Sequence, residues 1–226
     1  MSDMGDRGIR SYVLRAGRMT DAQKRAIERL WGRYGLDFDP GTRLETAAVF
    51  GNSHPVVAEI GFGMGQATWR IAQDNPDINY LGLEVHTPGV GRLLADLDSR
   101  AIVNVRIFRH DAVEVFESML PPASLAGLHI FYPDPWPKKR HHKRRLVREG
   151  LAEILASRIA PGGYLYFVTD IEDYALWSLD VLSRTEGLRN RFELFAPKQE
   201  WRPETKFEAH ASRDGRACWE LMFDRR

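Results

Sequence analysis

Residues 56–65 of the chain read VVAEIGFGMG, an apolar run that passes directly into three glycines at alternate positions. A short apolar run of this kind is typical of a strand that is buried on both faces of a parallel sheet. Glycines after such a strand allow a tight turn with positive φ and let a ligand approach the backbone closely. The stretch therefore predicts the first strand and the ligand-binding turn of an α/β fold, followed by a helix over residues 66–73.

Strand and helix patterns alternate along the rest of the chain. Further strands are expected at residues 79–85, 103–108, 125–132 and 164–169. Further helices are expected at residues 88–99, 144–159 and 172–185. This βαβα alternation predicts a mostly parallel sheet with helices on both faces.

The two ends of the chain depart from this pattern. Residues 192–196 and 217–223 both have strand patterns with no helix between them, which predicts a C-terminal antiparallel hairpin on the edge of a seven-stranded sheet. At the other end, residues 1–19 combine four arginines with few apolar side chains, which predicts a flexible basic arm. Thr20 and Gln23 have the spacing of a capping box, so we expect a helix to begin there.

Positive charge is concentrated in one segment. The 226 residues have a formal net charge of only +1, yet residues 138–148 hold seven of the 32 Lys and Arg residues and no acidic residue. A clustered basic patch on a nearly neutral protein is typical of contact with nucleic-acid phosphates. The alternative is a helix face that only interacts with solvent.

Composition also limits the domain count, the metal chemistry and the compartment. With 43% hydrophobic residues, we expect residues 20–226 to form one domain. Cys218 is the single cysteine, so neither an intrachain disulfide nor a cysteine zinc site can form, and the adjacent His141 and His142 cannot share one helix face as ligands. The N-terminus has no signal-peptide pattern and no apolar run has transmembrane length. A cytoplasmic protein without metal or membrane attachment is therefore expected.

Acidic residues lie at the carboxyl ends of three successive predicted strands. In a parallel sheet these ends meet at one edge. Glu59 lies at the entrance of the glycine turn, Glu84 at the end of the second strand and Asp111 after the third. The turn alone fits NAD, FAD or S-adenosylmethionine, but Glu59 would repel a pyrophosphate and tolerate an ammonium, and the spacing departs from the dinucleotide G-x-G-x-x-G. Glu84 could accept hydrogen bonds from ribose hydroxyls, and Asp111 from an adenine amino group. The alternative for each residue alone is a helix N-cap.

Asp134 follows the fourth predicted strand in the sequence FYPDPWP at residues 131–137. Prolines at alternate positions fix φ around it and limit how the loop relaxes. No second carboxylate and no Ser or Cys nucleophile shares the loop, so paired acid–base or nucleophilic catalysis is not expected. A single carboxylate can accept hydrogen bonds from a base edge and stabilise positive charge in a transition state. Methyl transfer to guanine N7 needs such a group, because N7 already carries a lone pair and its methylation makes the ring cationic.

Several stretches of the chain resemble the bacterial tRNA (guanine-N7)-methyltransferase family. They are RAGRMT at residues 15–20, EIGFG at 59–63, GLEVH at 82–86, PDPWPKKRH at 133–141, VTD at 168–170 and TKFE at 205–208. The first glycine motif is shared by many methyltransferases, whereas the PDPWPKK run is specific. The resemblance implies a class I, Rossmann-like methyltransferase fold with S-adenosylmethionine as the donor. It also implies that the acceptor is N7 of a guanine in the variable loop of tRNA (position 46 in the standard tRNA numbering), which becomes 7-methylguanosine.

The resemblance also implies roles for individual residues, which are assigned by their positions in the matching motifs. The cofactor would be bound by Glu59, Gly61, Gly63, Gly65, Glu84, Asp111 and Asp134, and Asp134 would be the catalytic residue. The substrate would be bound by Lys138, Asp170, Thr205, Lys206, Phe207 and Glu208. The cationic segment would contact RNA through Arg140, His141, His142, Lys143, Arg144 and Arg145. Whether Asp134 or Asp170 reads the guanine edge stays open, as does the choice between a monomer and a homodimer.

Two other classes of protein compete with this interpretation. A small-molecule or protein methyltransferase would keep the glycine turn and the Asp-Pro-Trp loop but would not need the basic segment. A non-catalytic RNA-binding protein would need the basic segment but not three acidic strand ends. Cofactor binding, followed by methyl incorporation into RNA or protein, separates the three classes.

Overall fold

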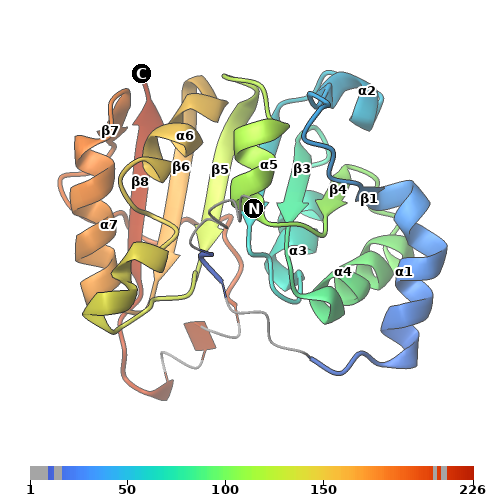
Figure 1. The fold of residues 1–226 in the computed structure, drawn as a ribbon. Coiled ribbons are helices and arrows are strands. Elements are labelled where there is room, and N and C mark those ends of the chain that lie inside the picture. Colours follow the sequence, from blue (N-terminus) through green and yellow to red (C-terminus); the bar gives the residue numbers. More distant parts are fainter. Residues whose placement is uncertain (1–9, 13–16, 206–207, 210–212) are drawn as a thin grey trace, which may run out of the picture.

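The computed structural model describes residues 10–12, 17–205, 208–209 and 213–226. Its centre is an eight-stranded sheet with the strand order β1-β4-β3-β2-β5-β6-β8-β7 (Figure 1). The strands are β1 Gly35–Leu36, β2 Val56–Ile60, β3 Asn79–Leu83, β4 Val105–Phe108, β5 Leu125–Phe131, β6 Ile159–Thr169, β7 Leu188–Asn190 and β8 Trp219–Arg225. Neighbours from β1 to β6 pair in parallel, whereas β8 runs antiparallel to both β6 and β7. The expected parallel sheet with an antiparallel C-terminal end is confirmed.

Helices cover both faces of this sheet (Figure 1). They are α1 Asp21–Tyr34, α2 Thr46–Phe50, α3 Gln66–Asp74, α4 Thr87–Ser99, α5 Ala112–Ser118, α6 Leu151–Arg158 and α7 Glu172–Arg184, with the 3-10 helix η1 at Lys139–Arg144. Side chains of α1, α3 and α4 belong to one hydrophobic core, and those of α5, α6 and α7 belong to a second. Because the sheet is covered on both faces, every residue of β2 and β3 is buried. None of the helices in the described ranges is both long and apolar enough to cross a membrane.

Local signals place the first helix where the sequence predicts it. Thr20 and Gln23 form the expected capping box, in which the Gln23 amide donates to the Thr20 hydroxyl at 3.2 Å and the Thr20 amide donates to the Gln23 side chain at 2.8 Å. The buried face of α1 carries Ala26, Leu30 and Tyr34, and it packs against α4. Capping and amphipathic spacing therefore agree, which is why this boundary could be predicted.

The edges of the sheet differ from the sequence expectation. β1 pairs with β4 and raises the strand count from seven to eight. A two-residue strand has no detectable periodicity, so only tertiary contact reveals it. The strand expected at residues 192–196 is wrong, because the strand that pairs with β8 is β7. The apolar residues that follow β7 pack beside β8 without forming a ladder, although the Ala196 amide donates to the Glu220 carbonyl at 2.7 Å.

The helix expected at residues 144–159 is shorter than its apolar pattern predicts. Regular helix covers only α6, because Gly150 immediately before it has a φ of 77°. Upstream, η1 and an irregular segment replace the expected helical turns, and the Val147 amide donates to the Tyr174 hydroxyl of α7 at 3.2 Å. Burial against α7, rather than alignment on one helix face, explains the apolar residues of this segment.

Candidate active site

A cavity of about 330 Å³ opens at the carboxyl edge of the sheet, where the parallel strands β2 to β5 end. Its walls come from the segments that follow these strands. These wall residues include Gly61 and Gly63 after β2, Glu84, Val85 and His86 after β3, His110 and Asp111 after β4, and Tyr132, Pro133 and Asp134 after β5. Open α/β sheets bind their ligands in such a crevice. Five of the seven residues predicted to bind a cofactor line it, and Glu59 and Gly65 do not.

Glu84 organises the glycine turn beside the cavity. Its Oε2 accepts from the Gly63 amide at 2.7 Å, and its Oε1 accepts from the amides of Val85 and His86 at 2.7 and 2.8 Å. Burial raises the pKa of Glu84, and these three backbone hydrogen bonds partly offset that shift. The two oxygens of a carboxylate offer about four acceptor positions. Glu84 can therefore hold the turn and still accept a hydrogen bond from a ligand hydroxyl.

The glycines around the turn serve two different purposes. Gly63 has a φ of 57°, and a Cβ built on it would meet no atom within 4 Å, so the space beside it is open. Gly65 has a φ of 73°, and a Cβ there would lie 2.7 Å from the Leu93 side chain of α4. Gly89, which the sequence reasoning missed, would place a Cβ 1.9 Å from the Gly63 carbonyl oxygen. Gly65 and Gly89 thus allow α3 and α4 to pack around the turn, whereas Gly63 faces the cavity.

Glu59 lies behind the cavity wall, on β2. Its side chain is 4% exposed, and burial together with the nearby Glu84 carboxylate raises the pKa of Glu59 to about 7. A positive charge that arrives beside such a carboxyl favours its ionised form. Glu59 is therefore placed to respond to the charge of a ligand without lining the cavity itself.

The raised pKa of Glu59 predicts a pH-dependent stability of the ligand-free protein. As the pH rises from about 4.5 to about 7, the unfolded chain has released this proton while the folded protein still binds it, so folding loses stability. The accumulated loss is about 3 kcal/mol. Glu59→Gln should lack this loss, which thermal unfolding of both proteins across the pH range would measure. Parallel curves for the parent and the variant would contradict the prediction.

Asp111 has a structural role as well as a place in the cavity wall. Its side chain accepts a hydrogen bond from the Val113 amide at 2.9 Å and caps α5, a helix that the sequence pattern did not predict. Burial raises the pKa of Asp111. Asp111 is therefore both the N-cap of α5 and a residue of the cavity wall.

Asp134 is exposed at the cavity rim, on the segment of residues 132–138, which we call the Asp134 loop. One non-glycine residue on each side of Asp134 has a positive φ, which is 51° at Tyr132 and 46° at Trp136. Such backbone conformations cost on the order of 1–3 kcal/mol each and persist only when the surroundings enforce them. The Trp136 indole is buried and donates to the Ser11 carbonyl at 3.0 Å. The loop is therefore a constrained platform for one carboxylate.

Part of the predicted basic arm contacts this platform. Residues 1–9 and 13–16 lie outside the described residues, so the flexibility of the arm stays a prediction. Ser11 and Tyr12 line one side of the cavity, and the Arg10 carbonyl accepts from Arg144 Nε at 3.3 Å. Sequence reasoning missed Ser11 and Tyr12 as site residues, because nothing in a polar arm signals contact with a distant loop.

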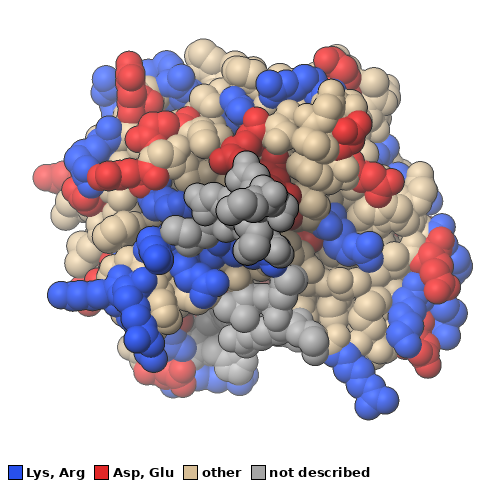
Figure 2. Space-filling view, viewed as in Figure 1, with Lys and Arg blue, Asp and Glu red and all other residues tan. Residues whose placement is uncertain are grey.

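The cationic segment at residues 138–148 is divided between solvent and the protein interior. Its exposed cations are Lys138, Lys139, Arg140 and Lys143, and Lys and Arg side chains gather over η1 (Figure 2). His141 and His142 are half-buried beside tryptophan rings, and the Arg144 guanidinium lies 4.2 Å from the centre of the Trp136 ring. Arg145 is fully buried, which corrects the expectation that it contacts RNA. The exposed residues are the part of the segment that can meet a polyanion.

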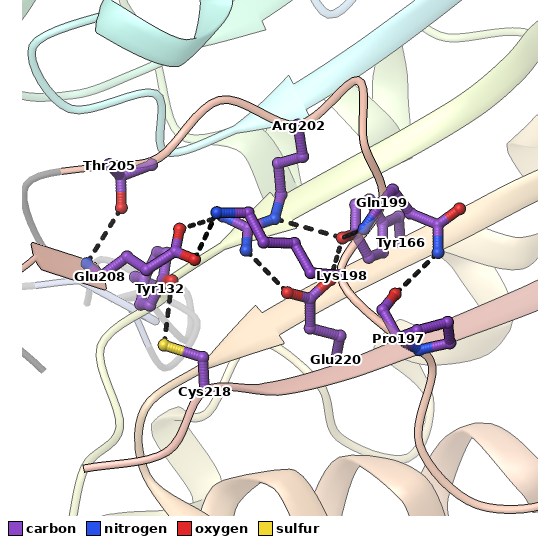
Figure 3. Close-up of polar contacts among 10 residues, drawn as sticks. All are labelled: Tyr132, Tyr166, Pro197, Lys198, Gln199, Arg202, Thr205, Glu208, Cys218 and Glu220. Carbon is purple, nitrogen blue, oxygen red and sulfur yellow. Dashed lines mark hydrogen bonds and ion pairs between the residues drawn. The ribbon is translucent and has the colours of Figure 1, made fainter. Parts of the chain in front are cut away.

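Glu208 is linked to the sheet through ion pairs (Figure 3). Arg202, fully buried and missed by sequence reasoning, donates to Glu208 at 2.8 Å and to Glu220 of β8 at 2.7 Å. Lys198 pairs with the other Glu208 oxygen at 2.7 Å. Each Glu208 oxygen thus has a cationic partner within the protein chain. Glu208 is therefore held by protein cations, and its direct contact with substrate stays a prediction.

The other predicted substrate residues are described only in part. Lys206 and Phe207 lie outside the described residues. The Thr205 hydroxyl accepts from the Glu208 amide at 3.2 Å, and Asp170 at the end of β6 pairs with Arg216. Neither Thr205 nor Asp170 lines the cavity, so their contacts with substrate stay predictions. Within the described ranges, no three His, Cys, Asp or Glu side chains are grouped to hold a metal ion.

The strand order, the reversed β8 and a glycine turn beside acidic strand ends define a class I methyltransferase fold. A family described as "Putative methyltransferase" matches residues 53–221. The chain is 52% identical over 218 residues to the tRNA (guanine-N(7)-)-methyltransferase of Thiobacillus denitrificans, with 96% of each chain covered. It is 48% identical over 223 residues to the protein of the same name from Chromohalobacter salexigens, with 97% of this chain and 90% of that one covered. The chain belongs to the tRNA (guanine-N(7)-)-methyltransferase family.

Solved structures confirm the fold. The 16S rRNA methyltransferase KamB matches 94% of this chain and 97% of its own chain with a TM-score of 0.56. The sequence identity over this match is 15%. The likeness therefore concerns the arrangement of strands and helices alone.

Proposed function

We propose that this enzyme transfers a methyl group from S-adenosylmethionine to N7 of a guanine in the variable loop of tRNA. The observation that carries the proposal is the position of Asp134, on a constrained loop between the cavity and the exposed cations of η1. One carboxylate can therefore face both a donor in the cavity and a base of an RNA bound to η1. The identity to enzymes named tRNA (guanine-N(7)-)-methyltransferase supports the choice of acceptor. A tRNA substrate would place the enzyme in the cytoplasm. The proposal fits either a monomer or a homodimer.

The residues of the cavity fit S-adenosylmethionine. Glu84 and Asp111 carry acceptor oxygens, which suit ribose hydroxyls and an adenine amino group and disfavour a pyrophosphate. A Cβ built on Gly61 would meet no atom within 4 Å, which leaves room for a ligand against the backbone. The carboxylates also favour a cationic sulfonium. When bound, this cofactor supplies an electrophilic methyl group.

The role of Asp134 follows from the chemistry of the acceptor. Guanine N7 has a lone pair and no proton to lose, so the reaction needs no general base. Methyl transfer would form the bond to N7 while the bond from the methyl carbon to the donor's sulfur breaks, so the guanine ring would gain a positive charge. Asp134 stabilises this charge on the base, an interaction that is stronger in the transition state than in the ground state.

The exposed cations of η1 should bind the tRNA backbone. Replacing Lys139, Arg140 and Lys143 together with alanine should weaken tRNA binding, because fewer counterions are released when the complex forms. The slope of log affinity against log salt should become shallower by about 2–3, since each lost phosphate contact contributes about 0.7–0.9. Titrations of unmodified tRNA at several salt concentrations would measure this slope.

A matched control removes three exposed cations elsewhere. Lys24, Arg25 and Arg29 lie on α1, and α1 and η1 are at opposite ends of the molecule (Figure 1). Alanine at these positions should leave the salt slope unchanged. An unchanged slope in the η1 variant as well would mean that η1 only interacts with solvent.

Methyl transfer to defined RNAs tests the proposed function. The enzyme should transfer labelled methyl groups to an unmodified tRNA transcript, and nucleoside analysis should identify 7-methylguanosine. A transcript whose variable-loop guanine is replaced by adenine should accept no label. Label in another nucleoside, or in protein but not in RNA, would refute the proposal.

A further inference from the structure

Arg145 is buried between α7 and the Asp134 loop, although it belongs to the cationic segment. Its side chain has no exposed surface. The guanidinium donates from Nε to the Pro135 carbonyl at 3.1 Å and from Nη2 to the Asp173 carboxylate on α7. It also lies over the rings of Tyr174 and Trp177, at 4.8 and 5.2 Å from their centres. One side chain thus joins the peptide that follows Asp134 to a helix of the core.

Burial of this charge is costly, and the ion pair with Asp173 offers weak compensation. A buried cation is tolerated only when it is paired and hydrogen-bonded. The Asp173 side chain is 68% exposed, so solvent screens the pair. The bond to the Pro135 carbonyl is the directional contact that an exposed arginine would not make. Stability of the ion pair alone therefore does not account for the position of Arg145.

The composition of the Asp134 loop explains why it needs an external donor. Pro133, Pro135 and Pro137 have no N–H, so the loop has few donors with which to hold its own carbonyls. Two positive φ angles flank Asp134, at Tyr132 and Trp136, and such conformations require enforcement by the surroundings. Trp136 is held by the Ser11 carbonyl on one side. Arg145 holds the centre of the loop, one residue after the carboxylate.

We propose that Arg145 is a positioning residue, which fixes the Asp134 carboxylate through the Pro135 carbonyl. The inference rests on the proposed function only in assigning the chemistry to Asp134. Arginine suits this task because its planar fork binds two acceptors in fixed directions, whereas a lysine at the same site cannot hold both. Misplacement of a reacting group by about 1 Å can cost on the order of 100-fold in rate.

The test compares Arg145→Lys with two controls. Arg145→Lys keeps the charge beside Asp173 and should lower kcat for tRNA methylation by about 100-fold, with the Kd for S-adenosylmethionine and the KM for tRNA unchanged. Asp173→Asn weakens the ion pair but keeps the bond to Pro135, so it should lower the unfolding temperature and leave kcat unchanged. Lys24→Ala, an exposed cation on α1 outside the site, should leave kcat, the Kd for S-adenosylmethionine and the KM for tRNA unchanged.

Hydrogen exchange supplies a readout that does not depend on activity. The amides of Asp134 and Trp136 should exchange faster in Arg145→Lys than in the parent or in Asp173→Asn. A parental kcat in folded Arg145→Lys would overturn the proposal, as would an equal loss of kcat in Asp173→Asn, because the ion pair would then be the cause. If the parent methylates a base other than guanine, the proposed function fails, and the same comparison on that base still decides the role of Arg145.

Discussion

Asp134→Asn should lower kcat for tRNA methylation by about 10²–10³-fold, the effect of removing one preorganised electrostatic contact to a transition state. Asparagine keeps the shape of the side chain and the hydrogen-bonding carbonyl but removes the negative charge. Because the charge on guanine develops during methyl transfer, the KM for tRNA should change much less than kcat. Steady-state rates with unmodified tRNA at saturating S-adenosylmethionine would measure both constants.

The alternative role for Asp134 is to order the proline loop around it. Asp134→Ala then separates the two roles, because it removes shape and charge together. If charge is the cause, Asp134→Asn and Asp134→Ala should lose similar amounts of kcat. A near-parental kcat in Asp134→Asn would end the charge-stabilisation role and leave Asp134 as a structural residue.

Glu84→Ala should weaken the binding of S-adenosylmethionine by about 1–3 kcal/mol, which is the range for a charged hydrogen-bonding group. The variant loses the proposed acceptor for the ribose hydroxyls. It also releases the Gly63 amide, which Glu84 holds at 2.7 Å, so the turn loses part of its support. Isothermal titration of the ligand-free enzyme would give the change in Kd.

Glu117→Ala is the control for this measurement. Glu117 is an exposed carboxylate on α5, outside the cavity wall, and its loss should leave the Kd unchanged. Circular dichroism should show that both variants are folded. Parental affinity in a folded Glu84→Ala enzyme would remove Glu84 from the cofactor site.

The central part of the fold was predictable from the sequence because its local signals and its burial agree. β2 covers the apolar run that precedes the glycine turn, and α1 begins at the predicted capping box. The sheet edges were less predictable. β1 is too short to have a pattern, and residues 192–196 have the composition of a strand without pairing as one. Whether an edge segment pairs depends on which strand lies beside it in the folded protein, and the local sequence does not encode that neighbour.

The candidate site was predictable to the extent that topology alone determines it. Glu84, Asp111 and Asp134 follow the parallel strands β3, β4 and β5, so their convergence at one edge follows from the shared strand direction. Glu59 follows the same rule but lies behind the wall, because it is a residue of β2 itself and is enclosed on one face of the sheet. Two residues further along, at Gly61, the chain has left the strand and enters the turn that lines the cavity.

By itself, the sequence determined the parallel sheet, the glycine turn, the acidic strand ends and the constrained carboxylate Asp134. These features depend on residue type and on spacing along a single strand or turn. Only the tertiary structure decided which charges stay in solvent. Arg145 and Arg202 resemble exposed cations in the sequence, yet both are fully buried. The free energy of burying a charge depends on partners that other elements supply, here Asp173 on α7 and Glu220 on β8, and no local pattern encodes those contacts.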